Sequence, residues 1–313
     1  MDDGSGWLAE ALKARACFKA QDDDGALRHL DQAAALGAND SEVTLLRGLA
    51  LLRQGRLAEG WPCFEARRTR WNSPIARSGL REWSGEPLEG RSLVVWGEQG
   101  LGDEIQFARF LPKLRTLGVR WITAGVLPQN IRLFQALGAD LVLPRTERQD
   151  VPVADYWVCL ASLPYRLGVR APSDVPSAAY LSPRWIGGDD RIGIVWRGNP
   201  GNPNDKARSL PSPEPLLALP GAVELEPAGD MLDSLEAIRR LRAVVTVDTS
   251  WAHLAGAIGA PCMVLLPHEL TDWRWGLSDD RSYWYESLRL FRQSSPGDWA
   301  EVVTRAGAEA AGR

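Results

Sequence analysis

One group of candidate site residues follows the strand-like run Ala243–Val247. Residues suited to holding an anion come directly after it: Asp248, Thr249, Ser250, His253 and Gly256. The first three are favourable N-cap residues, so a helix is predicted to begin among them. The N terminus of that helix would offer free N–H groups and the positive end of the helix dipole. The pattern therefore predicts a diphosphate site, beside which His253 is either a packing residue or a functional one.

A second group lies in the polar loop after the strand-like run Arg191–Trp196. Arg197, Lys206 and Arg208 are cationic. Asn199 and the neighbouring glycines and prolines favour a loop. Three cations could neutralise two phosphates through charge-assisted hydrogen bonds. The alternative is a solvated polar turn that binds nothing.

A third group is a glycine-rich turn after the strand-like run Ser92–Trp96. It contains Gly97, Gly100 and Gly102, with Asp103 directly after them. Glycines let the backbone approach a ligand closely. Their GxxGxG spacing differs from the GxGxxG of dinucleotide sites, which disfavours a nicotinamide cofactor. Asp103 is either the N-cap of the following helix or a general base at a cleft, and the spacing leaves both open.

The acidic clusters do not predict a metal site. Asp22–Asp24 lies between two predicted helices, where turn formation and capping explain it. Asp189–Asp190 and Asp279–Asp280 have no histidine or third acid near them in the sequence. No GxxxxGK(S/T) or GxSxG string occurs, which excludes a P-loop nucleotidase and argues against an α/β-hydrolase. We predict neither a metal ion nor a bound cofactor.

The composition is that of a globular protein. Of 313 residues, 45% are hydrophobic and 24% are charged, which excludes a disordered or collagen-like chain. The net charge of −4 gives no basic footprint for nucleic acid. No apolar run reaches the ~18 residues of a membrane span, and Met1–Ser5 lacks the features of a signal peptide. We therefore expect a cytoplasmic protein without a membrane span and without a nucleic-acid partner.

Residues 1–72 are predicted to form a helical segment. Apolar residues recur at helical spacing in Leu8, Leu12 and Ala16. A shift of 34 positions aligns small or apolar residues with one another: Ala14 with Gly48, Cys17 with Leu51, Ala26 with Gly60 and Leu30 with Phe64. That period is typical of the tetratricopeptide repeat, of which about three are needed for an independent array. We expect the helical segment to dock against the rest of the chain, as a helical cap or as a groove for a protein partner.

The remaining chain predicts two α/β units, a first lobe (88–185) and a second lobe (186–313). Short apolar runs alternate with amphipathic helices in both, as in doubly wound parallel sheets. Strands are predicted at Ser92–Trp96, Arg120–Ala124, Asp140–Leu143, Arg191–Trp196, Ala222–Leu225, Ala243–Val247 and Pro261–Leu266. The proline-rich residues 144–190 are predicted to form a lid and a linker. Two Rossmann-like units would hold a ligand in the cleft between them, at the carboxyl ends of both sheets.

Four longer strings together resemble a known family: Trp96–Phe110, Val247–Gly259, Asp272–Gly276 and Leu290–Trp299. They are similar to bacterial TPR-containing glycosyltransferases related to the heptosyltransferase-like family nine, with a looser similarity to protein O-GlcNAc transferases. The resemblance covers nearly the whole chain. It implies a GT-B fold of two Rossmann-like domains preceded by an all-α TPR-like segment. The implied activity is metal-independent, inverting transfer of a sugar from a nucleotide-diphosphate donor to a protein or glycan hydroxyl.

The resemblance also implies roles for individual residues. Asp103 matches the family's catalytic base. The donor-phosphate motif is matched by Asp248, Thr249, Ser250, His253 and Gly256, and the loop on the other side of the donor by Arg197, Asn199 and Lys206. We expect His253 to take part in catalysis. The segment between Gly221 and Asp233, which frames the donor nucleotide in relatives, is shorter here.

Two other functions remain open at this point. A degenerate transferase retained as an interaction module would bind a protein partner at residues 6–70 and no nucleotide in the cleft. A nucleotide-sugar epimerase built on two Rossmann units would need acid and base groups from both lobes. The first lobe offers only Glu98, Asp103 and Glu104 for that chemistry.

Overall fold

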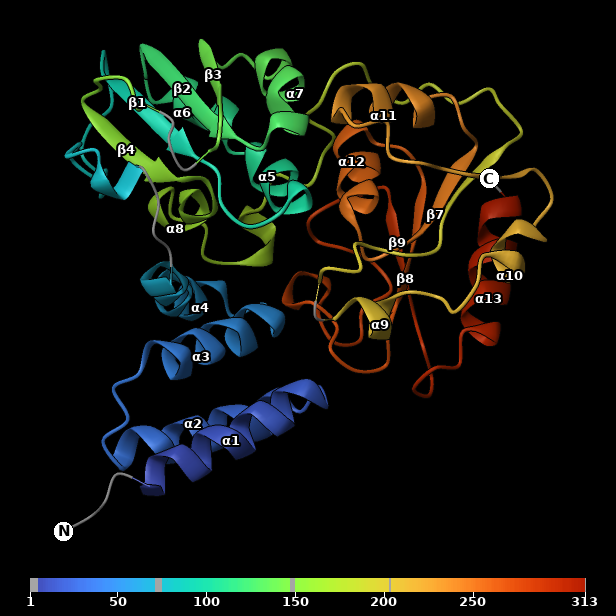
Figure 1. The fold of residues 1–313 in the computed structure, drawn as a ribbon, viewed down its shortest axis with the longest axis horizontal. Coiled ribbons are helices and arrows are strands. Elements are labelled where there is room, and N and C mark those ends of the chain that lie inside the picture. The colour runs from blue at the N-terminus through green and yellow to red at the C-terminus, as the bar shows by residue number, and fades with distance from the viewer. Residues whose placement is uncertain (1–4, 71–74, 147–149, 203, 313) are drawn as a thin grey trace.

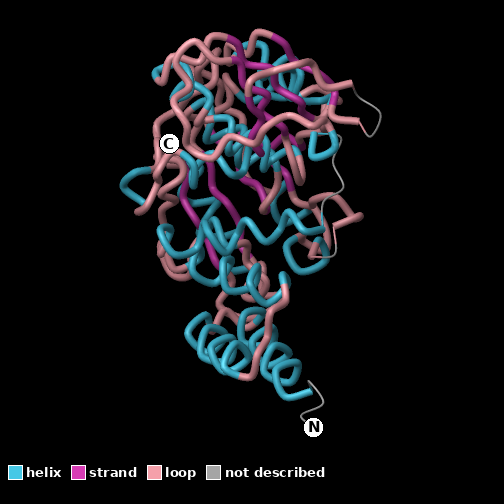
Figure 2. The backbone as a smooth tube through the Cα atoms, turned by 90° about the vertical axis from the view of Figure 1, so that its left-hand side faces the viewer, coloured by secondary structure: helices cyan, strands magenta, loops and turns pink. Residues whose placement is uncertain are grey.

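The computed structural model describes residues 5–70, 75–146, 150–202 and 204–312, which form three packed bodies (Figure 1). The two lobes lie side by side, green on the left and yellow to red on the right, and the helical segment lies below them in blue. The view turned by 90° shows the helical segment at one end of the molecule, the end marked N (Figure 2). Residues 1–4 and 71–72 of the predicted helical segment, and Pro203 of the polar loop, lie outside the described residues.

The helical segment consists of two successive helix pairs. Its helices are α1 (Ser5–Lys19), α2 (Asp23–Ala35), α3 (Ser41–Arg53) and α4 (Leu57–Phe64). A Cβ atom added at Gly48 would lie 2.7 Å from the Phe64 nitrogen, and one added at Gly60 would lie 2.7 Å from Leu52 Cγ. Ala14 and Ala26, aligned with these glycines by the 34-residue shift, are fully buried. Small residues therefore stand where the helices of both pairs approach, whereas the tetratricopeptide assignment itself stays a prediction.

The apolar stripe that predicted the first helix is not its buried face. Leu8 and Leu12 are 50% and 58% exposed, and Ala16 is exposed as well. Ala14 and Phe18 pack inward instead. Apolar spacing predicted the helix here, but the buried face is set by the neighbouring helix.

The first lobe contains a four-stranded parallel sheet in the order β3-β2-β1-β4. Its elements are β1 (Ser92–Trp96), α5 (Leu101–Ala108), α6 (Leu111–Thr116), β2 (Trp121–Val126), α7 (Ile131–Ala136), β3 (Leu141–Pro144), β4 (Tyr156–Cys159) and α8 (Leu163–Arg166). Strand β4 and helix α8 lie within residues 144–190, so the prediction of only a lid and a linker there was wrong. Four residues are too few to show a strand period, and β4 gains its burial from pairing with β1.

The second lobe contains a five-stranded parallel sheet in the order β6-β5-β7-β8-β9. Its elements are β5 (Ile192–Val195), α9 (Asp205–Arg208), α10 (Glu214–Leu217), β6 (Ala222–Glu224), α11 (Met231–Ile238), β7 (Ala243–Val247), α12 (Ser250–Ile258), β8 (Cys262–Leu266), β9 (Leu288–Arg292) and α13 (Ala300–Ala311). Six 3-10 helices complete the described chain: Glu65–Arg70, Ile75–Arg77, Pro128–Asn130, Leu160–Ser162, Pro172–Asp174 and Trp273–Trp275. The fold is thus mixed α/β with two Rossmann-like parallel sheets.

The helical segment docks against both lobes, as predicted. In the first lobe, Glu98 accepts from Arg67 Nε at 2.9 Å and from Arg67 Nη2 at 2.6 Å. Toward the second lobe, Arg53 Nη1 donates to the Thr271 carbonyl at 3.1 Å. Both arginines are buried, so the helical segment is held to the two lobes by buried ion pairs and hydrogen bonds and not only by surface contacts.

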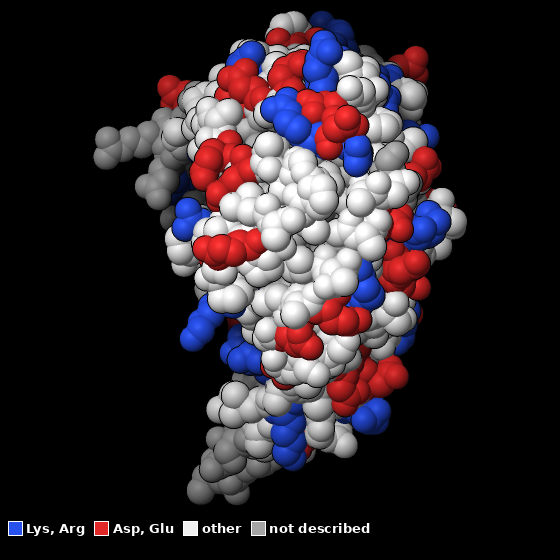
Figure 3. All heavy atoms as spheres, turned by 90° about the vertical axis from the view of Figure 1, so that its right-hand side faces the viewer, with Lys and Arg blue, Asp and Glu red and all other residues white. Residues whose placement is uncertain are grey.

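Two further features concern the charge on the surface and the length of the helices. The face on the right of Figure 1 has cationic and acidic side chains interspersed, without a large basic area (Figure 3). None of the helices in the described ranges is long and apolar enough to cross a bilayer.

Candidate functional site

A cavity of about 1010 Å³ lies between the carboxyl ends of the two sheets. The turns after β1, β5, β6 and β7 line it, together with Asp272 and Arg274. In the second sheet, the strand order reverses between β5 and β7. Ligands of open α/β sheets bind at such a reversal, outside the carboxyl ends of the strands. Helices α5 and α12 pack side by side between the lobes (Figure 1), so the N termini of both lie at this cleft.

The N terminus of α12 is capped by a hydroxyl group. Thr249 Oγ1 accepts the Trp251 N–H at 3.3 Å and lies 3.1 Å from Thr246 Oγ1. Ser250 is the first helical residue, and Thr249 and Ser250 both line the cavity. A neutral cap adds no charge of its own at the positive end of the helix dipole, which favours an anion there.

The N terminus of α5 is filled by a carboxylate. Its N-cap is Gly100, and Asp103 is the third helical residue. Asp103 Oδ2 accepts the Gly100 N–H at 2.9 Å, while Oδ1 lies 2.5 Å from Arg274 Nη2. Asp103 therefore accepts a hydrogen bond from the backbone N–H of the N-cap residue, Gly100, but is not the N-cap residue itself. Its side chain is 18% exposed and lines the cleft, within reach of a ligand.

Arg274 joins the two lobes across the cleft. From the 3-10 turn Trp273–Trp275, it reaches Asp103 and donates through Nε to Gln106 Oε1 at 2.6 Å. Its Nη1 lies 2.8 Å from Asp272 Oδ2. Burial lowers the pKa of this guanidinium, but the carboxylates of Asp272, Asp103 and Asp248 outweigh it, and the net pKa is above the usual value. Arg274 is therefore a permanent cation in the cleft.

Sequence reasoning missed Arg274. Its partner Asp103 lies 171 positions away, so no local spacing connects them. Arg274 belongs to the Asp272–Gly276 string that carries part of the family resemblance, and only this string could have pointed to it.

Asp248 and His253 have shifted protonation equilibria. Burial and the neighbouring Asp272 raise the pKa of Asp248, against the effects of Arg274 and Arg208. Burial, Arg274 and Arg109 hold the pKa of His253 well below its usual range. His253 is thus a neutral imidazole at neutral pH, with Nδ1 at 2.9 Å from the Tyr285 hydroxyl and its ring stacked on Trp275.

The basic loop after β5 also lines the cavity. Arg197, Asn199 and Arg208 face the cavity, and Arg208 is held by Asp205 Oδ1 at 3.3 Å. Lys206 is exposed on α9 and is not among the described residues that line the cavity. The turn of α9 thus presents Arg208 to the cleft where the sequence pointed to Lys206.

The predicted glycines serve mainly close packing around the cleft. A Cβ atom at Gly102 would lie 2.6 Å from His253 Cδ2, and one at Gly97 would lie 2.3 Å from Glu104 Oε1. Gly256 faces Tyr285, where a Cβ atom would approach Cδ1 to 2.3 Å. Gly100 and Gly102 line the cavity, whereas Gly97 and Gly256 are not among the described lining residues.

The turn below Gly97 is held by a buried acid. Glu104 is 0% exposed and accepts from the Leu127 N–H, from Asn130 Nδ2 at 2.9 Å and from Arg145 Nε at 3.1 Å. Burial raises its pKa to about 7, against these hydrogen bonds. Glu104 therefore shapes the turn from beneath, while Asp103 faces the cleft.

The short segment after β6 forms one edge of the cavity. Glu224, Leu225, Glu226 and Pro227 line it, and α11 begins at Met231. Glu224 Oε1 accepts the Trp196 indole N–H at 2.5 Å. Three acids of the cleft, Asp103, Asp205 and Asp272, pair with arginines. The described ranges contain no group of three or more His, Cys, Asp or Glu side chains that could hold a metal ion.

Comparison with known proteins gives limited similarity. No protein-family model matches the chain. Protein FlbA of Caulobacter vibrioides is 27% identical over 322 aligned positions, which cover 83% of this chain and 53% of FlbA. The chain thus spans about half the length of this curated relative. A mutant O-GlcNAc transferase of Thermobaculum terrenum aligns over 100% of this chain and 92% of its own, at 10% identity and a TM-score of 0.30.

Proposed function

We propose that this chain transfers a sugar from a nucleotide-diphosphate donor to a hydroxyl group, with inversion at the anomeric carbon and without a metal ion. The observation that carries the proposal is the pair of unlike helix N termini at one cleft. The hydroxyl-capped N terminus of α12 suits an anion, and Asp103 at the N terminus of α5 suits a proton acceptor.

The donor would lie against the second lobe. Its diphosphate would meet Thr249 and Ser250 at α12, together with Arg197 and Arg208 on the loop after β5. These groups would stabilise the charge that develops on the leaving diphosphate, a role that a metal ion takes in other sites. Arg274 adds a fixed cation, whereas neutral His253 could donate a hydrogen bond but no charge.

The reaction would be a single displacement. The acceptor oxygen forms a new bond to the anomeric carbon, while the bond from that carbon to the diphosphate oxygen breaks and its electron pair leaves with the diphosphate. The hydroxyl proton passes to the carboxylate of Asp103. Arg274 and the Gly100 N–H hold that carboxylate in one orientation, which supports its use as a positioned base.

A direct test is incubation of the protein with a panel of nucleotide sugars in excess EDTA. Release of a nucleoside diphosphate and a product anomer opposite to that of the donor, read by NMR, are the expected results. Metal-dependent release or a retained anomer would contradict the proposed mechanism.

A second candidate function is a protein-interaction module built on an inactive transferase. It is favoured by one observation, that both carboxylate oxygens of Asp103 already have partners. This function predicts that no nucleotide binds in the cleft. Turnover of any nucleotide sugar in the test above would exclude it.

A further inference from the structure

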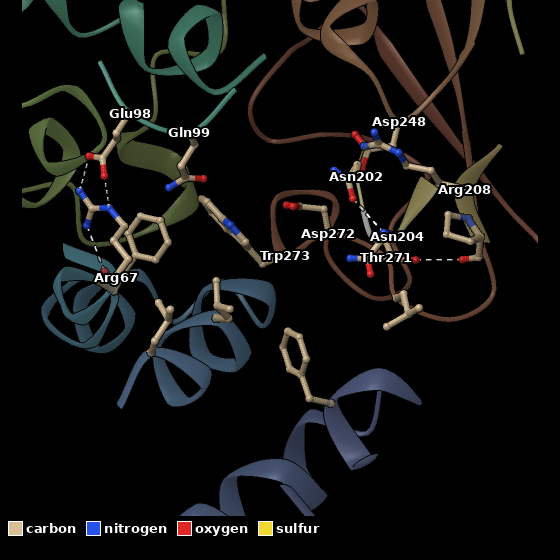
Figure 4. A pocket seen from close by; sticks show the side chains of 16 residues that line it. Arg67, Glu98, Gln99, Asn202, Asn204, Arg208, Asp248, Thr271, Asp272 and Trp273 are labelled. Atoms are coloured by element: carbon tan, nitrogen blue, oxygen red, sulfur yellow. Dashed lines mark hydrogen bonds and ion pairs between the residues drawn. The ribbon is translucent and has the colours of Figure 1, made fainter. Parts of the chain in front are cut away.

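A second cavity, of about 420 Å³, lies where the helical segment meets both lobes (Figure 4). One wall is apolar and comes largely from the helical segment: Phe18, Leu45, Leu49, Phe64, Leu270 and Trp273. Phe18 is on α1, Leu45 and Leu49 on α3, and Phe64 on α4. We call this space the junction cavity. The helical segment therefore builds part of a pocket and does not only support the lobes.

The junction cavity continues into the cleft between the lobes. Five residues line both spaces: Gln99, Asn202, Arg208, Asp248 and Asp272. Gln99 lies in the glycine turn that leads into α5 and the proposed base Asp103, and has a left-handed backbone with φ of 63°. A group seated in the junction cavity would thus adjoin the place where an acceptor hydroxyl must enter the cleft.

Buried ion pairs hold the walls of the junction cavity in place. Arg67 is bound to Glu98 and donates to Ser162 Oγ at 2.8 Å. Arg53 pairs with Asp23, and both side chains are fully buried. Gln21 Nε2 adds a contact to Thr271 Oγ1 at 3.2 Å. Satisfied buried pairs of this kind fix geometry, so the cavity is preformed.

The composition of the walls selects the occupant. A sugar ring needs many hydrogen bonds. The lining also contains charged residues, but Arg67 and Glu98 bind each other, Arg208 binds Asp205 and Asp272 binds Arg274. Few polar groups are therefore left for sugar hydroxyls beside the apolar wall. Figure 4 shows the Gln99 amide directed toward Trp273, while Asn202 and Asn204 stand on the opposite side. Side-chain amides both donate and accept, and so match the N–H and C=O groups of a peptide backbone. A volume at the lower end of small-molecule pockets suits one large side chain better than a long lipid chain.

We propose that the acceptor is a polypeptide, and that the junction cavity receives an aromatic or large aliphatic side chain next to the Ser or Thr that is modified. This inference rests on the proposed glycosyl transfer, in which the Ser or Thr oxygen gains the sugar and its proton passes to Asp103. The helical segment would then determine acceptor specificity. Leu45 and Leu49 line the junction cavity, so they would favour acceptor sites that have a large apolar side chain next to the hydroxyl.

The test uses short synthetic peptides with one Ser or Thr and one variable neighbour: Trp, Phe, Leu, Ala or Lys. The donor is a nucleotide sugar that the wild-type protein hydrolyses. We expect the Phe and Leu peptides to be modified roughly tenfold faster than the Ala and Lys peptides at one position relative to the hydroxyl. Leu49→Trp should remove this advantage by filling the cavity, and Leu49→Ala should shift it toward a Trp peptide.

A matched control separates the effect of the cavity from a general effect of the substitution. Leu12→Trp makes the same change on the exposed face of α1, and should keep the wild-type peptide preference. Donor hydrolysis without peptide should be the same in all four proteins, which also reports that the variants are folded.

Each result has one meaning. Equal rates for all peptides, an unchanged preference in Leu49→Trp, or transfer to a lipid-linked glycan but to no peptide would overturn the inference and leave the proposed transferase intact. No hydrolysis of any nucleotide sugar by the wild-type protein would instead overturn the proposed function itself.

Discussion

The two strand-to-helix turns that face each other across the cleft differ in what fills their helix N termini. At α5 the chain supplies its own carboxylate, because Asp103 accepts the Gly100 N–H and pairs with Arg274. At α12 the cap is the Thr249 hydroxyl. One N terminus is already occupied by a carboxylate, whereas the other is capped by a neutral group. From this difference we infer that the second turn binds the anionic donor and the first supplies the base.

The second turn also contains an acid, because Asp248 lies directly before the Thr249 cap. Its charge would oppose the binding of an anion at α12. Burial and Asp272 raise its pKa to about 6, so this carboxyl gains a proton more readily than an ordinary aspartate. Protonation would remove the charge that opposes a diphosphate at α12. The two turns therefore differ in the setting of their acids as well as in their caps.

Replacing Asp103 should give the largest effect. Asp103→Asn keeps an acceptor for the Gly100 N–H but no base, so turnover should fall by about 10²–10⁴ while donor affinity stays nearly constant. Steady-state rates and calorimetric titration measure the two quantities. Asp190→Asn, whose side chain is 98% exposed, is the control and should leave both unchanged. Near-normal turnover in Asp103→Asn would show that the base is elsewhere.

Removing Arg274 should break the connection between the turns. Arg274→Gln leaves the partly buried carboxylates of Asp103 and Asp272 without their cation, at a cost of about 2–3 kcal/mol in the free energy of unfolding. Urea denaturation checks this value. Arg191→Gln, at an arginine whose side chain is 59% exposed, should cost roughly 0.5 kcal/mol or less. Equal losses in the two variants would mean that Arg274 does not hold the cleft together.

A pair of cap variants sharpens the role of α12. Thr249→Val removes the hydroxyl cap and should lower the free energy of unfolding by about 1 kcal/mol. Asp40→Ala removes the N-cap of α3, which accepts the Glu42 N–H at 2.7 Å, and should cost a similar amount. Only Thr249→Val should also weaken donor binding, as measured by calorimetry. Equal donor affinity in both variants would place the diphosphate elsewhere.

The smallest expected effect is a pH dependence of donor affinity. A bound diphosphate favours protonated Asp248, so affinity should rise a few-fold as pH falls through about 6. The charged groups that act on Asp248 are Asp272, Arg274 and Arg208, and the arginines do not titrate here. An intact nucleotide sugar is the correct probe, because its phosphates keep their charge in this range. Asp248→Asn should abolish the pH dependence, and a persisting dependence would assign it to another group.

The sequence predicted the elements around the cleft better than the contacts across it. Strands β1 and β7 have the predicted bounds, because each is a mainly apolar run that is followed at once by Gly97 or by the polar residues Asp248 and Thr249. Strand β9 was missed, since Leu288–Arg292 alternates with arginines and depends on pairing with β8. Leu8 and Leu12 predicted the helix correctly but are exposed, because helical spacing does not identify the neighbour against which a helix packs.

The candidate site was predictable only where its groups are local in sequence. Thr249 and Ser250 follow directly from the end of β7, and Asp103 from the glycine turn. Arg274 was not predictable, because its partners Asp103 and Gln106 come from the first lobe. The choice of Arg208 over Lys206 depends on the rotation of the short helix α9, which composition does not encode. The junction cavity required all three bodies to be docked.

The most direct test of the central claim is a thermal unfolding screen with nucleoside diphosphates and nucleotide sugars in excess EDTA. A ligand at 100 times its dissociation constant stabilises by about 2.7 kcal/mol, which raises the unfolding temperature by several degrees. We predict such a rise with at least one nucleotide, unchanged by added magnesium and reduced in Arg208→Gln but not in Arg191→Gln. No rise with any nucleotide, or a rise only with a metal ion, would contradict the account.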